Sequence, residues 1–271
     1  MQKPCFIMGI LNVTPDSFSD GGDFLAHTAL EYRIDELLCH GADIIDVGGE
    51  STRPGAETVD EDEELSRVLP AIHSIRRKST VTISVDTTKA HVAREALAAG
   101  ANMVNDISAL EQDPSMLEVL LASQVPVVLM HKKGDPCTMQ HNPVYADVVA
   151  EINAYLAERI YVLEKNGIPR SNIIVDPGLG FGKTLAHNLA ILRNLHSFKQ
   201  HGCRLLIGHS RKSFLGKLLH IEDPAQRDWP TAMVSAFCRQ ARVDILRVHN
   251  VLATRQAFLL QDALDLSVNE A

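Results

Sequence analysis

Short apolar runs recur along the whole chain, and nearly all of them end on a polar residue. Eight runs can be marked, and the residues that close them are Asn12, Asp46, Asp86, Asn105, His131, Asp176, Ser210 and the pair Arg247 and His249. A strand that becomes polar only at its C-terminal end buries its body and presents its tip. Most intervals between these ends have room for one amphipathic helix. This pattern predicts an α/β fold, a closed (β/α)8 or TIM barrel with its active site at the C-terminal rim.

The runs are nearly continuous in Ile, Val and Leu, as expected for parallel strands covered by helices. The predicted strands are residues 5–12, 43–48, 80–86, 102–107, 125–131, 172–176, 204–209 and 244–249. Helical spacing of apolar residues predicts helices over 28–40, 61–77, 90–99, 115–123, 145–166, 186–200, 211–219 with 231–240, and 253–264. Gly41, Gly100 and Gly167 stand where glycine commonly ends a helix.

The composition is that of an ordinary globular chain of 271 residues, and we expect residues 1–271 to form a single barrel domain. Lys and Arg number 26, Asp and Glu number 34, and the net charge is −8. No basic tract stands out, so nucleic acid is not expected as a partner. Because a local group of cations sets the field in a cleft, an anionic substrate is compatible with this acidic total.

Cysteine usage and the N-terminal residues indicate where the protein works. The five cysteines are scattered and contain no CxxC pair, which is typical of a reducing compartment. The apolar start leads directly into Thr14-Pro15-Asp16 without a small-residue cleavage site, so it predicts a strand rather than a signal peptide. No apolar run is long enough to cross a bilayer. We therefore expect a soluble, cytoplasmic protein with no membrane partner.

Two long polar loops are expected at the catalytic rim, residues 14–26 after the first strand and 49–60 after the second. An open doubly wound sheet is the competing architecture, but its dinucleotide fingerprint is absent from the sequence. Gly178, Gly180 and Gly182 form GxGxG rather than GxGxxG. The same segment is not a P-loop, because Pro177 stands where that motif requires its first glycine.

Four short polar side chains, Asp46, Asp86, Asn105 and Asp176, close the second, third, fourth and sixth strands. On rigid strand ends they suit a flat polar heterocycle. The acids accept hydrogen bonds from ring N–H and amino groups, and the amide both donates and accepts. Each acid could instead cap the helix that follows it. Four such caps together explain the pattern less well than one shared ligand.

A second group of side chains, Asn12, Lys212, Arg247 and His249, belongs to the first, seventh and eighth strands, which are neighbours in a closed barrel. Barrels commonly bind phosphate in this part of the rim. Arg247 and His249 are two residues apart and are expected to face the same side, where they would donate hydrogen bonds to an anion. Asn12 brings an oxygen that could coordinate Mg²⁺ shared with phosphate.

Two of these cations have plainer alternatives. Lys212 could be a solvated lysine in the first turn of a helix, and Arg247 could form an ion pair with Asp244 or Asp228. We favour the anion site over both alternatives.

The three rim histidines, His131, His209 and His249, invite comparison with a metallohydrolase. That chemistry needs a closely spaced pair of ligands, and no HxH pair follows the first strand. A single histidine at a strand end is more often structural. His131 and His209 are therefore left without an assigned role.

Residues 8–22 (MGILNVTPDSFSDGG) resemble the first signature of the dihydropteroate synthases, and residues 46–55 (DVGGESTRPG) resemble the second. Shorter motifs follow in the family's order at 84–87, 105–107, 130–131, 176–183, 210–213 and 247–249. The resemblance covers nearly the whole chain, and the two signatures together are highly specific. It implies a transferase of folate synthesis that joins 6-hydroxymethyl-7,8-dihydropterin diphosphate to p-aminobenzoate and releases pyrophosphate.

The resemblance also implies roles for the matching residues. The pterin would be held by Asp86, Asn105, Asp176, Lys212 and Arg247. The diphosphate would be held with Mg²⁺ by Asn12, Arg247 and His249. The p-aminobenzoate pocket, where sulfonamides also bind in this family, would comprise Phe18, Thr52, Arg53, Pro54, Phe181 and Ser210. The residues expected to take part in the reaction itself are Asp16, Asp20, Arg53, Lys212, Arg247 and His249.

Three segments depart from the family pattern: Asn250 stands where Asp is usual, residues 239–244 lack a small Gly-Ala pair, and 131–133 lack the common Met-rich continuation. None of them falls on a residue matched to the pterin. Two rival functions are a pterin-barrel methyltransferase and a barrel that binds pterin or a partner without catalysis. Residues 52–54 and 210–213 favour the synthase over the first, and the group Asn12, Arg247 and His249 favours it over the second. Relatives are commonly homodimers, so the resemblance also implies a homodimer.

Overall fold

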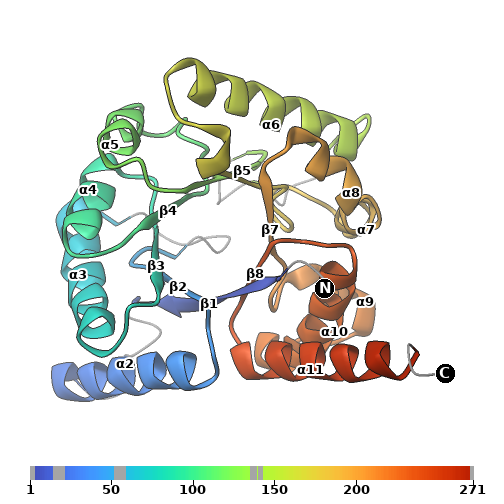
Figure 1. Ribbon diagram of the computed structural model, residues 1–271, viewed down its shortest axis with the longest axis horizontal. Helices are drawn as coiled ribbons and strands as arrows, with labels where there is room; N and C mark the ends of the chain where they lie inside the picture. Colours follow the sequence, from blue (N-terminus) through green and yellow to red (C-terminus); the bar gives the residue numbers. More distant parts are fainter. Residues whose placement is uncertain (1–3, 15–21, 52–58, 135–138, 140–142, 269–271) are drawn as a thin grey trace.

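The computed structural model describes residues 4–14, 22–51, 59–134, 139 and 143–268. Eight parallel strands close into a barrel in which each strand pairs with its sequence neighbours and the last pairs with the first (Figure 1). The strands are β1 Phe6–Asn12, β2 Ile44–Gly48, β3 Thr82–Asp86, β4 Met103–Asp106, β5 Val127–Met130, β6 Ile173–Asp176, β7 Arg204–Gly208 and β8 Ile245–Val248. The predicted barrel is confirmed, and each strand lies within its expected range.

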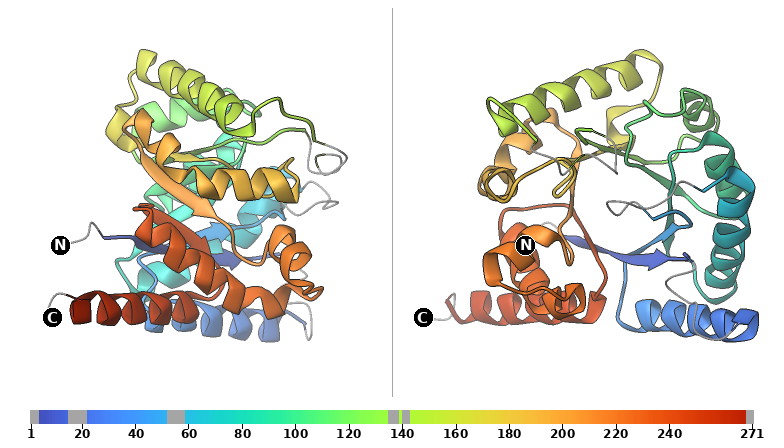
Figure 2. Two further views of the ribbon diagram at one scale, coloured as in Figure 1. Left: turned by 90° about the vertical axis from the view of Figure 1, so that its right-hand side faces the viewer. Right: turned by 180° about the vertical axis from the view of Figure 1, so that it is seen from behind.

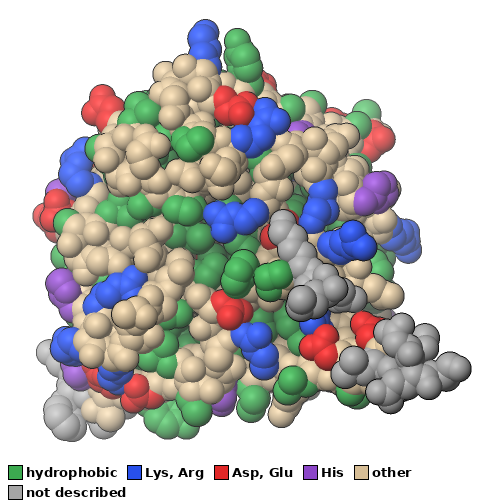
Figure 3. Space-filling model, in the orientation of Figure 1, with side chains coloured by type: hydrophobic (Ala, Val, Ile, Leu, Met, Phe, Trp, Pro, Cys, Tyr) green, Lys and Arg blue, Asp and Glu red, His purple; other side chains and the backbone are tan. Residues whose placement is uncertain are grey.

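Helices cover the outside of the barrel, as the side and rear views show (Figure 2). They are α2 Gly22–Cys39, α3 Glu61–Lys78, α4 Ala90–Ala98, α5 Met116–Ser123, α6 Val148–Lys165, α7 Leu185–Arg193, α8 Leu195–Phe198, α9 Ser213–Leu219, α10 Asp228–Gln240 and α11 Val251–Val268, with 3-10 turns η1 Arg170–Asn172, η2 Lys199–His201 and η3 Pro224–Arg227. No helix in the described part of the chain combines the length and apolarity needed to span a membrane. Acidic and basic side chains are intermingled on the face drawn in Figure 3.

Three helix predictions need correction. The helix expected from residue 28 begins at Gly22, so the first rim loop ends earlier than expected. The helix expected over 145–166 begins at Val148, because the Asp147 side chain caps it at that point. The single helix expected over 186–200 is interrupted at Asn194, whose backbone leaves the helical region at φ −118° and ψ 29°. The segment then continues as α8 and η2.

The inside of the barrel is built in two layers, an apolar one toward the N-terminal ends of the strands and a polar one above it. The apolar layer is a cluster of seven buried side chains: Met8, Ile44, Met103, Val128, Ile174, Leu206 and Ile245. Residues two positions apart on a strand face the same side. Two positions after four of these residues, the same inner face therefore presents Asp46, Asn105, Asp176 and Arg247. Strand periodicity thus brings these polar groups together next to the apolar layer.

The turn after β6 depends on a glycine that no other residue can replace without strain. Gly178 has φ +67°, and a methyl group there would lie 2.0 Å from the carbonyl oxygen of His131. We expect Gly178→Ala to lower the free energy of unfolding by at least about 3 kcal/mol, because a backbone atom cannot rotate away from the clash. Gly202 has a similar φ of +69°, but a methyl group there would meet nothing closer than Arg170 Cδ at 3.7 Å.

Gly202→Ala is therefore the matched control. It should lower the free energy of unfolding by only about 1 kcal/mol, the energy needed to hold alanine in the left-handed backbone conformation. Denaturant unfolding of both variants measures the two losses. Equal losses would show that the approach to His131 does not constrain this turn.

Candidate active site

Arg247 lies at the centre of the polar layer, where two carboxylates bind its guanidinium. Its Nε donates to Asp46 Oδ2 at 2.6 Å, and its Nη2 donates to Asp86 Oδ2 at 2.5 Å. Asp46 Oδ2 also accepts a hydrogen bond from Asn105 Nδ2 at 3.1 Å. Side chains from β2, β3, β4 and β8 are thus joined in one buried group. We call this group, Asp46, Asp86, Asn105 and Arg247, the central cluster.

Asp46 is fully buried rather than presented at a strand end. It lies two residues before β2 ends at Gly48, the predicted end of the strand, and is 0% exposed. Its buried Oδ1 has no hydrogen-bond partner among the described residues. From this depth Asp46 holds Arg247 and Asn105 from below and does not cap a helix.

The alternative for Arg247, an ion pair with Asp244 or Asp228, is wrong. Of the two acids considered, Asp244 pairs with Lys199 and Asp228 pairs with Arg211. The contacts that Arg247 makes cross the barrel to β2 and β3 instead.

Burial dominates the titration of the central cluster. It raises the pKa of Asp86 to about 7, with Arg247 opposing the rise and Asp46 adding to it. Burial lowers the pKa of Arg247, but Asp46 and Asp86 together outweigh it, so the pKa of Arg247 is raised. The guanidinium therefore remains charged and holds the two acids close to each other.

Asp176 and Lys212 lie beside the central cluster, and the charge of each opposes the effect of burial on the pKa of the other. Asp176 Oδ1 accepts a hydrogen bond from the N–H of Gly178 at 2.8 Å. Lys212 Nζ donates to the carbonyl of Leu179 and lies 4.1 Å from the centre of the Phe181 ring. Burial lowers the pKa of Lys212 to about 7 against the opposing effect of Asp176, and burial likewise raises the pKa of Asp176. The alternative of a solvated lysine in the first turn of a helix is therefore wrong.

The glycine segment after β6 makes room for this lysine. A methyl group on Gly180, which has φ +81°, would lie 2.8 Å from Lys212 Cδ. The Gly180 N–H donates to Asn188 Oδ1 at 2.8 Å, which fixes the turn. The GxGxG segment that fails as a nucleotide motif thus serves to bring Lys212 against the backbone.

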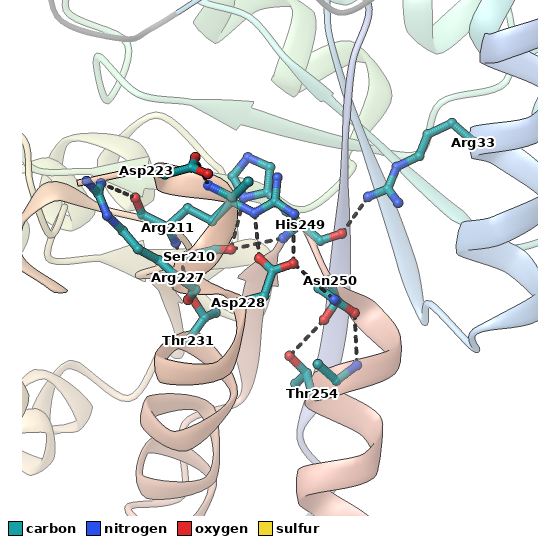
Figure 4. A network of polar contacts seen from close by, with 12 residues as sticks. Arg33, Ser210, Arg211, Asp223, Arg227, Asp228, Thr231, His249, Asn250 and Thr254 are labelled. Atoms are coloured by element: carbon teal, nitrogen blue, oxygen red, sulfur yellow. Dashed lines mark hydrogen bonds and ion pairs between the residues drawn. The ribbon is translucent and has the colours of Figure 1, made fainter. Parts of the chain in front are cut away.

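His249 lies beyond the end of β8 and against Ser210, which follows β7 (Figure 4). Its backbone N–H donates to Ser210 Oγ at 3.1 Å, and its Nδ1 lies 2.9 Å from the same oxygen. Its carbonyl accepts a hydrogen bond from Arg33 on α2. Because β8 ends at Val248, the strand alternation expected to align His249 with Arg247 does not extend to it.

Asn250, the departure from the family pattern, joins two elements beside His249. Its Nδ2 donates to Asp228 Oδ2 at 3.0 Å, and its Oδ1 accepts from the N–H of Ala253 at 2.9 Å at the start of α11. Asp228 also accepts two hydrogen bonds from Arg211, at 2.5 and 2.8 Å. Burial raises the pKa of Asp228, but the hydrogen bonds from Arg211 and Asn250 outweigh it, so this pKa is lowered.

Asn12 ends β1 close to the central cluster. A methyl group on Gly48 would lie 3.8 Å from Asn12 Oδ1 and 3.7 Å from Asp86 Oδ2, so the glycine leaves a space that these two oxygens flank. Within the described ranges, no three His, Cys, Asp or Glu residues are arranged to hold a metal ion. Six further residues matched to the site lie outside the described residues, namely Asp16, Phe18, Asp20, Thr52, Arg53 and Pro54.

The sequence signals no role for Lys183, which is buried behind the site. Its Nζ lies 3.0 Å from His131 Nδ1 and donates to the carbonyl of Phe181 at 2.9 Å. Burial lowers the pKa of Lys183 and lowers that of His131 to about 3. His209 is also buried and bonds to the carbonyl of Thr231 on α10, and burial lowers its pKa to about 4. Both unassigned histidines are therefore structural.

A barrel whose mouth holds fixed donors and acceptors suits a flat heterocycle, and comparison identifies the class as a pterin-binding enzyme. The family described as "Pterin binding enzyme" matches residues 8–249. A dihydropteroate synthase from Synechocystis sp. is 45% identical over 262 residues, 97% of this chain and 91% of that protein.

Solved structures of dihydropteroate synthase from Xanthomonas albilineans agree with this class. One, with 4-aminobenzoic acid, is 43% identical with a TM-score of 0.90 and covers 96% of this chain and 93% of its own. Another, in complex with 7,8-dihydropteroate, is 40% identical with a TM-score of 0.87 and covers 96% of this chain and 94% of its own. The chain belongs to the pterin-binding enzyme family and, within it, to the dihydropteroate synthases.

Removing Arg247 would leave Asp46 and Asp86 buried together without their cation. We expect Arg247→Leu to lower the free energy of unfolding by about 3–5 kcal/mol at about pH 9. The folded chain holds the Asp86 proton more tightly than the unfolded chain, so this group lowers stability as pH rises from 3.8 to about 7. In the wild type, Arg247 offsets part of that loss. The difference in the free energy of unfolding between Arg247→Leu and the wild type should therefore be smaller at about pH 5, where Asp86 is protonated.

Arg255→Leu is the control, because it removes a more exposed arginine that pairs with Asp43 at 2.9 Å. It should cost at most about 1 kcal/mol, with little dependence on pH. Denaturant unfolding at both pH values gives the comparison. A deficit in Arg247→Leu that does not change with pH would contradict this account of the cluster.

Proposed function

We propose that this chain condenses 6-hydroxymethyl-7,8-dihydropterin diphosphate with p-aminobenzoate to give 7,8-dihydropteroate and pyrophosphate. The observation that carries the proposal is the central cluster, with Asp176 and Lys212 beside it, at the mouth of the barrel. Family membership supports the choice of substrates. We place the reaction in the cytoplasm, because the four cysteines that the structure describes are free thiols.

The amino-pyrimidine edge of the pterin would be held by Asp86, Asn105 and Asp176. The carboxylates accept from the ring N–H and the exocyclic amino group, and the amide can both donate and accept. Lys212 would donate to the ring, and Arg247 would cover its face as a planar cation. Because Asp86, Asn105 and Asp176 are each no more than 8% exposed, their hydrogen bonds would be stronger than at the surface.

The diphosphate would lie against Asn12, Arg247 and His249. Its departure places negative charge on the leaving oxygens, and the cation of Arg247 and an N–H of His249 stabilise that charge. Mg²⁺ would be held in the same place by Asn12, and the side-chain oxygens of Asn12 and Asp86 on either side of Gly48 support this assignment. When bound by Asn12 and phosphate oxygens, this ion supplies further neutralisation of the leaving group.

Loss of diphosphate leaves a methylene cation that the electron-rich pterin ring delocalises. The weakly basic aromatic amine then attacks a carbon that is already cationic, so the step needs no strong general base. Phe181 would form one wall of the amine pocket. The rim loops would exclude water, which would otherwise trap the cation. The assignments to those loops, Asp16, Phe18, Asp20, Thr52, Arg53 and Pro54, and that of Ser210 to the amine pocket, stay predictions from the family motifs.

Release of pyrophosphate tests the proposal, with the purified protein, Mg²⁺, the pterin diphosphate and p-aminobenzoate in the assay. Release that depends on the amine supports the synthase. Methyl transfer from a methylated folate to a corrinoid would establish the methyltransferase in its place. Pterin binding without either reaction would establish a barrel that has lost catalysis.

Asp176→Asn tests the pterin assignment within the same assay. Asp176 is 5% exposed, and the variant replaces an acceptor oxygen with a donor that would face the donors of the pterin. We expect its affinity for the pterin diphosphate to fall at least about a hundredfold. Asp35→Asn, at an exposed site on α2, is the control and should bind normally. Calorimetry measures both, and wild-type affinity in Asp176→Asn would remove the pterin from this position.

We also propose that the chain forms a homodimer through α10 and α11. These helices pack against each other and lie side by side in Figure 1. Large apolar side chains recur on them at helical spacing and are exposed: Trp229, Met233, Phe237, Leu252, Leu259, Leu260 and Leu264. Exposed patches of this size mark interaction surfaces, and a twofold contact would cover the same patch on both chains.

Charge introduced into this surface tests the dimer. We expect wild-type protein to have the mass of a dimer and Met233→Glu with Leu260→Glu to have that of a monomer, because the interface would bury unpaired carboxylates. Tyr161→Glu is the control, since Tyr161 is 63% exposed on α6, far from α10 and α11 in Figure 1. Light scattering after gel filtration measures the masses. A monomeric wild type, or a dimeric double variant, would contradict the proposal.

A further inference from the structure

One buried hydroxyl oxygen, Ser210 Oγ, is bonded twice by the same residue. The backbone N–H of His249 donates to it at 3.1 Å, and His249 Nδ1 lies 2.9 Å from it. The two residues follow β7 and β8, which pair as neighbouring parallel strands. Ser210 is 6% exposed, so its hydroxyl proton needs an acceptor within the protein.

The chemistry of these two contacts decides which ring nitrogen carries the proton. A backbone N–H only donates, so it occupies one lone pair of Ser210 Oγ. If Nδ1 also carried hydrogen, the oxygen would accept twice, and the hydroxyl proton would find no acceptor among the residues the structure describes. If Nδ1 is bare, the hydroxyl donates to it and both groups are satisfied. We propose that Ser210 is a positioning residue that fixes neutral His249 as the Nε2–H tautomer.

The surrounding network holds this geometry in place (Figure 4). Arg211, the residue after Ser210, donates to both oxygens of Asp228. Asn250, the residue after His249, donates to the same carboxylate at 3.0 Å. Asp228 therefore ties the two strand ends together on the side of α10, and the short distance between Ser210 and His249 does not depend on a single contact.

The tautomer matters for the leaving group, and here the inference rests on the proposed function, in which His249 binds the diphosphate. A hydrogen on Nε2 makes the neutral ring a donor on the edge opposite Ser210. Such a donor adds a hydrogen bond to phosphate without adding positive charge beside Arg247. The other tautomer would turn a lone pair toward the phosphate oxygens and repel them. Ser210 thereby acts at the diphosphate end of the substrate through His249.

Nitrogen-15 NMR of the wild-type protein tests the tautomer directly. The protein is labelled at histidine, the pH is raised until the His249 signals stop changing, and these signals are assigned by their loss in His249→Gln. We expect a protonated Nε2 and a bare Nδ1. A protonated Nδ1 would overturn the proposal.

Variants then test what the tautomer does. We expect Ser210→Ala to give a mixture of tautomers and to bind inorganic pyrophosphate with Mg²⁺ about tenfold more weakly. Ser210→Thr keeps the hydroxyl, so it should show the single tautomer and the affinity of the wild type. Ser235→Ala removes another buried hydroxyl beside a histidine, His209, and should change neither for His249. A raised KM for p-aminobenzoate with unchanged pyrophosphate affinity in Ser210→Ala would place this hydroxyl in the amine pocket and overturn the positioning role.

These measurements separate the inference from the proposed function. An Nε2–H tautomer in a protein that never releases pyrophosphate would support the geometry and refute the synthase activity. Amine-dependent release by a protein with a protonated Nδ1 would refute the tautomer and leave the activity standing.

Discussion

The guanidinium of Arg247, bound between Asp46 and Asp86, is the interaction on which the rest of the site depends. Two carboxylates buried in one cavity repel each other, and each loses the hydration it has in water. A single cation that bonds both offsets these costs and fixes where their remaining lone pairs point. Asn105 is held by the same carboxylate. The acceptors and donors of the mouth therefore have their directions before any ligand arrives, which is the condition for strong recognition of a rigid ring.

Burial brings the pKa values of the acid Asp86 and the base Lys212 close together, because it raises the first and lowers the second. It raises the pKa of Asp86 to about 7 and lowers that of Lys212 to about 7. Both shifts reduce the charge carried by side chains that water cannot solvate well. A ligand that brings N–H donors to Asp86 and an acceptor to Lys212 restores the charged forms of both, because hydrogen bonds to a charged form favour it. In the proposed function, recognition of the pterin ring would in this way be coupled to the ionisation of Asp86 and Lys212.

The barrel could be predicted from the sequence because strand bodies and polar strand ends obey a period that the chain displays directly. Strand order then placed Asp86, Asn105 and Arg247 at one rim. The complete burial of Asp46 could not be predicted, since a polar residue at this position also suits an exposed strand end. The partners of Arg247 also could not be predicted from the sequence, because an ion pair across a barrel depends on inter-strand register rather than on nearness in sequence.

Arg33 and Asp228 support the position of His249 in a way that the sequence does not signal. Arg33 and Asp228 occupy ordinary helical positions, and only the closed barrel brings them to the residues that follow β7 and β8. Asn250 attracted attention as a departure from the family, but the sequence could not say what it contacts. The assignments on the two rim loops depend on motif similarity alone, because they lie outside the described residues.

Asn250 shows how a change of one charge can be absorbed by a network. Asp228 accepts two hydrogen bonds from Arg211 and a third from the Asn250 amide. A carboxylate at position 250 has no N–H to donate, so it would face Asp228 as a like charge, and the two would compete for Arg211. The amide joins the strand ends by a donated bond and still caps α11 through its oxygen. The central cluster is thus held together by buried opposite charges, whereas the residues around His249 are held by directed hydrogen bonds to the carboxylate of Asp228.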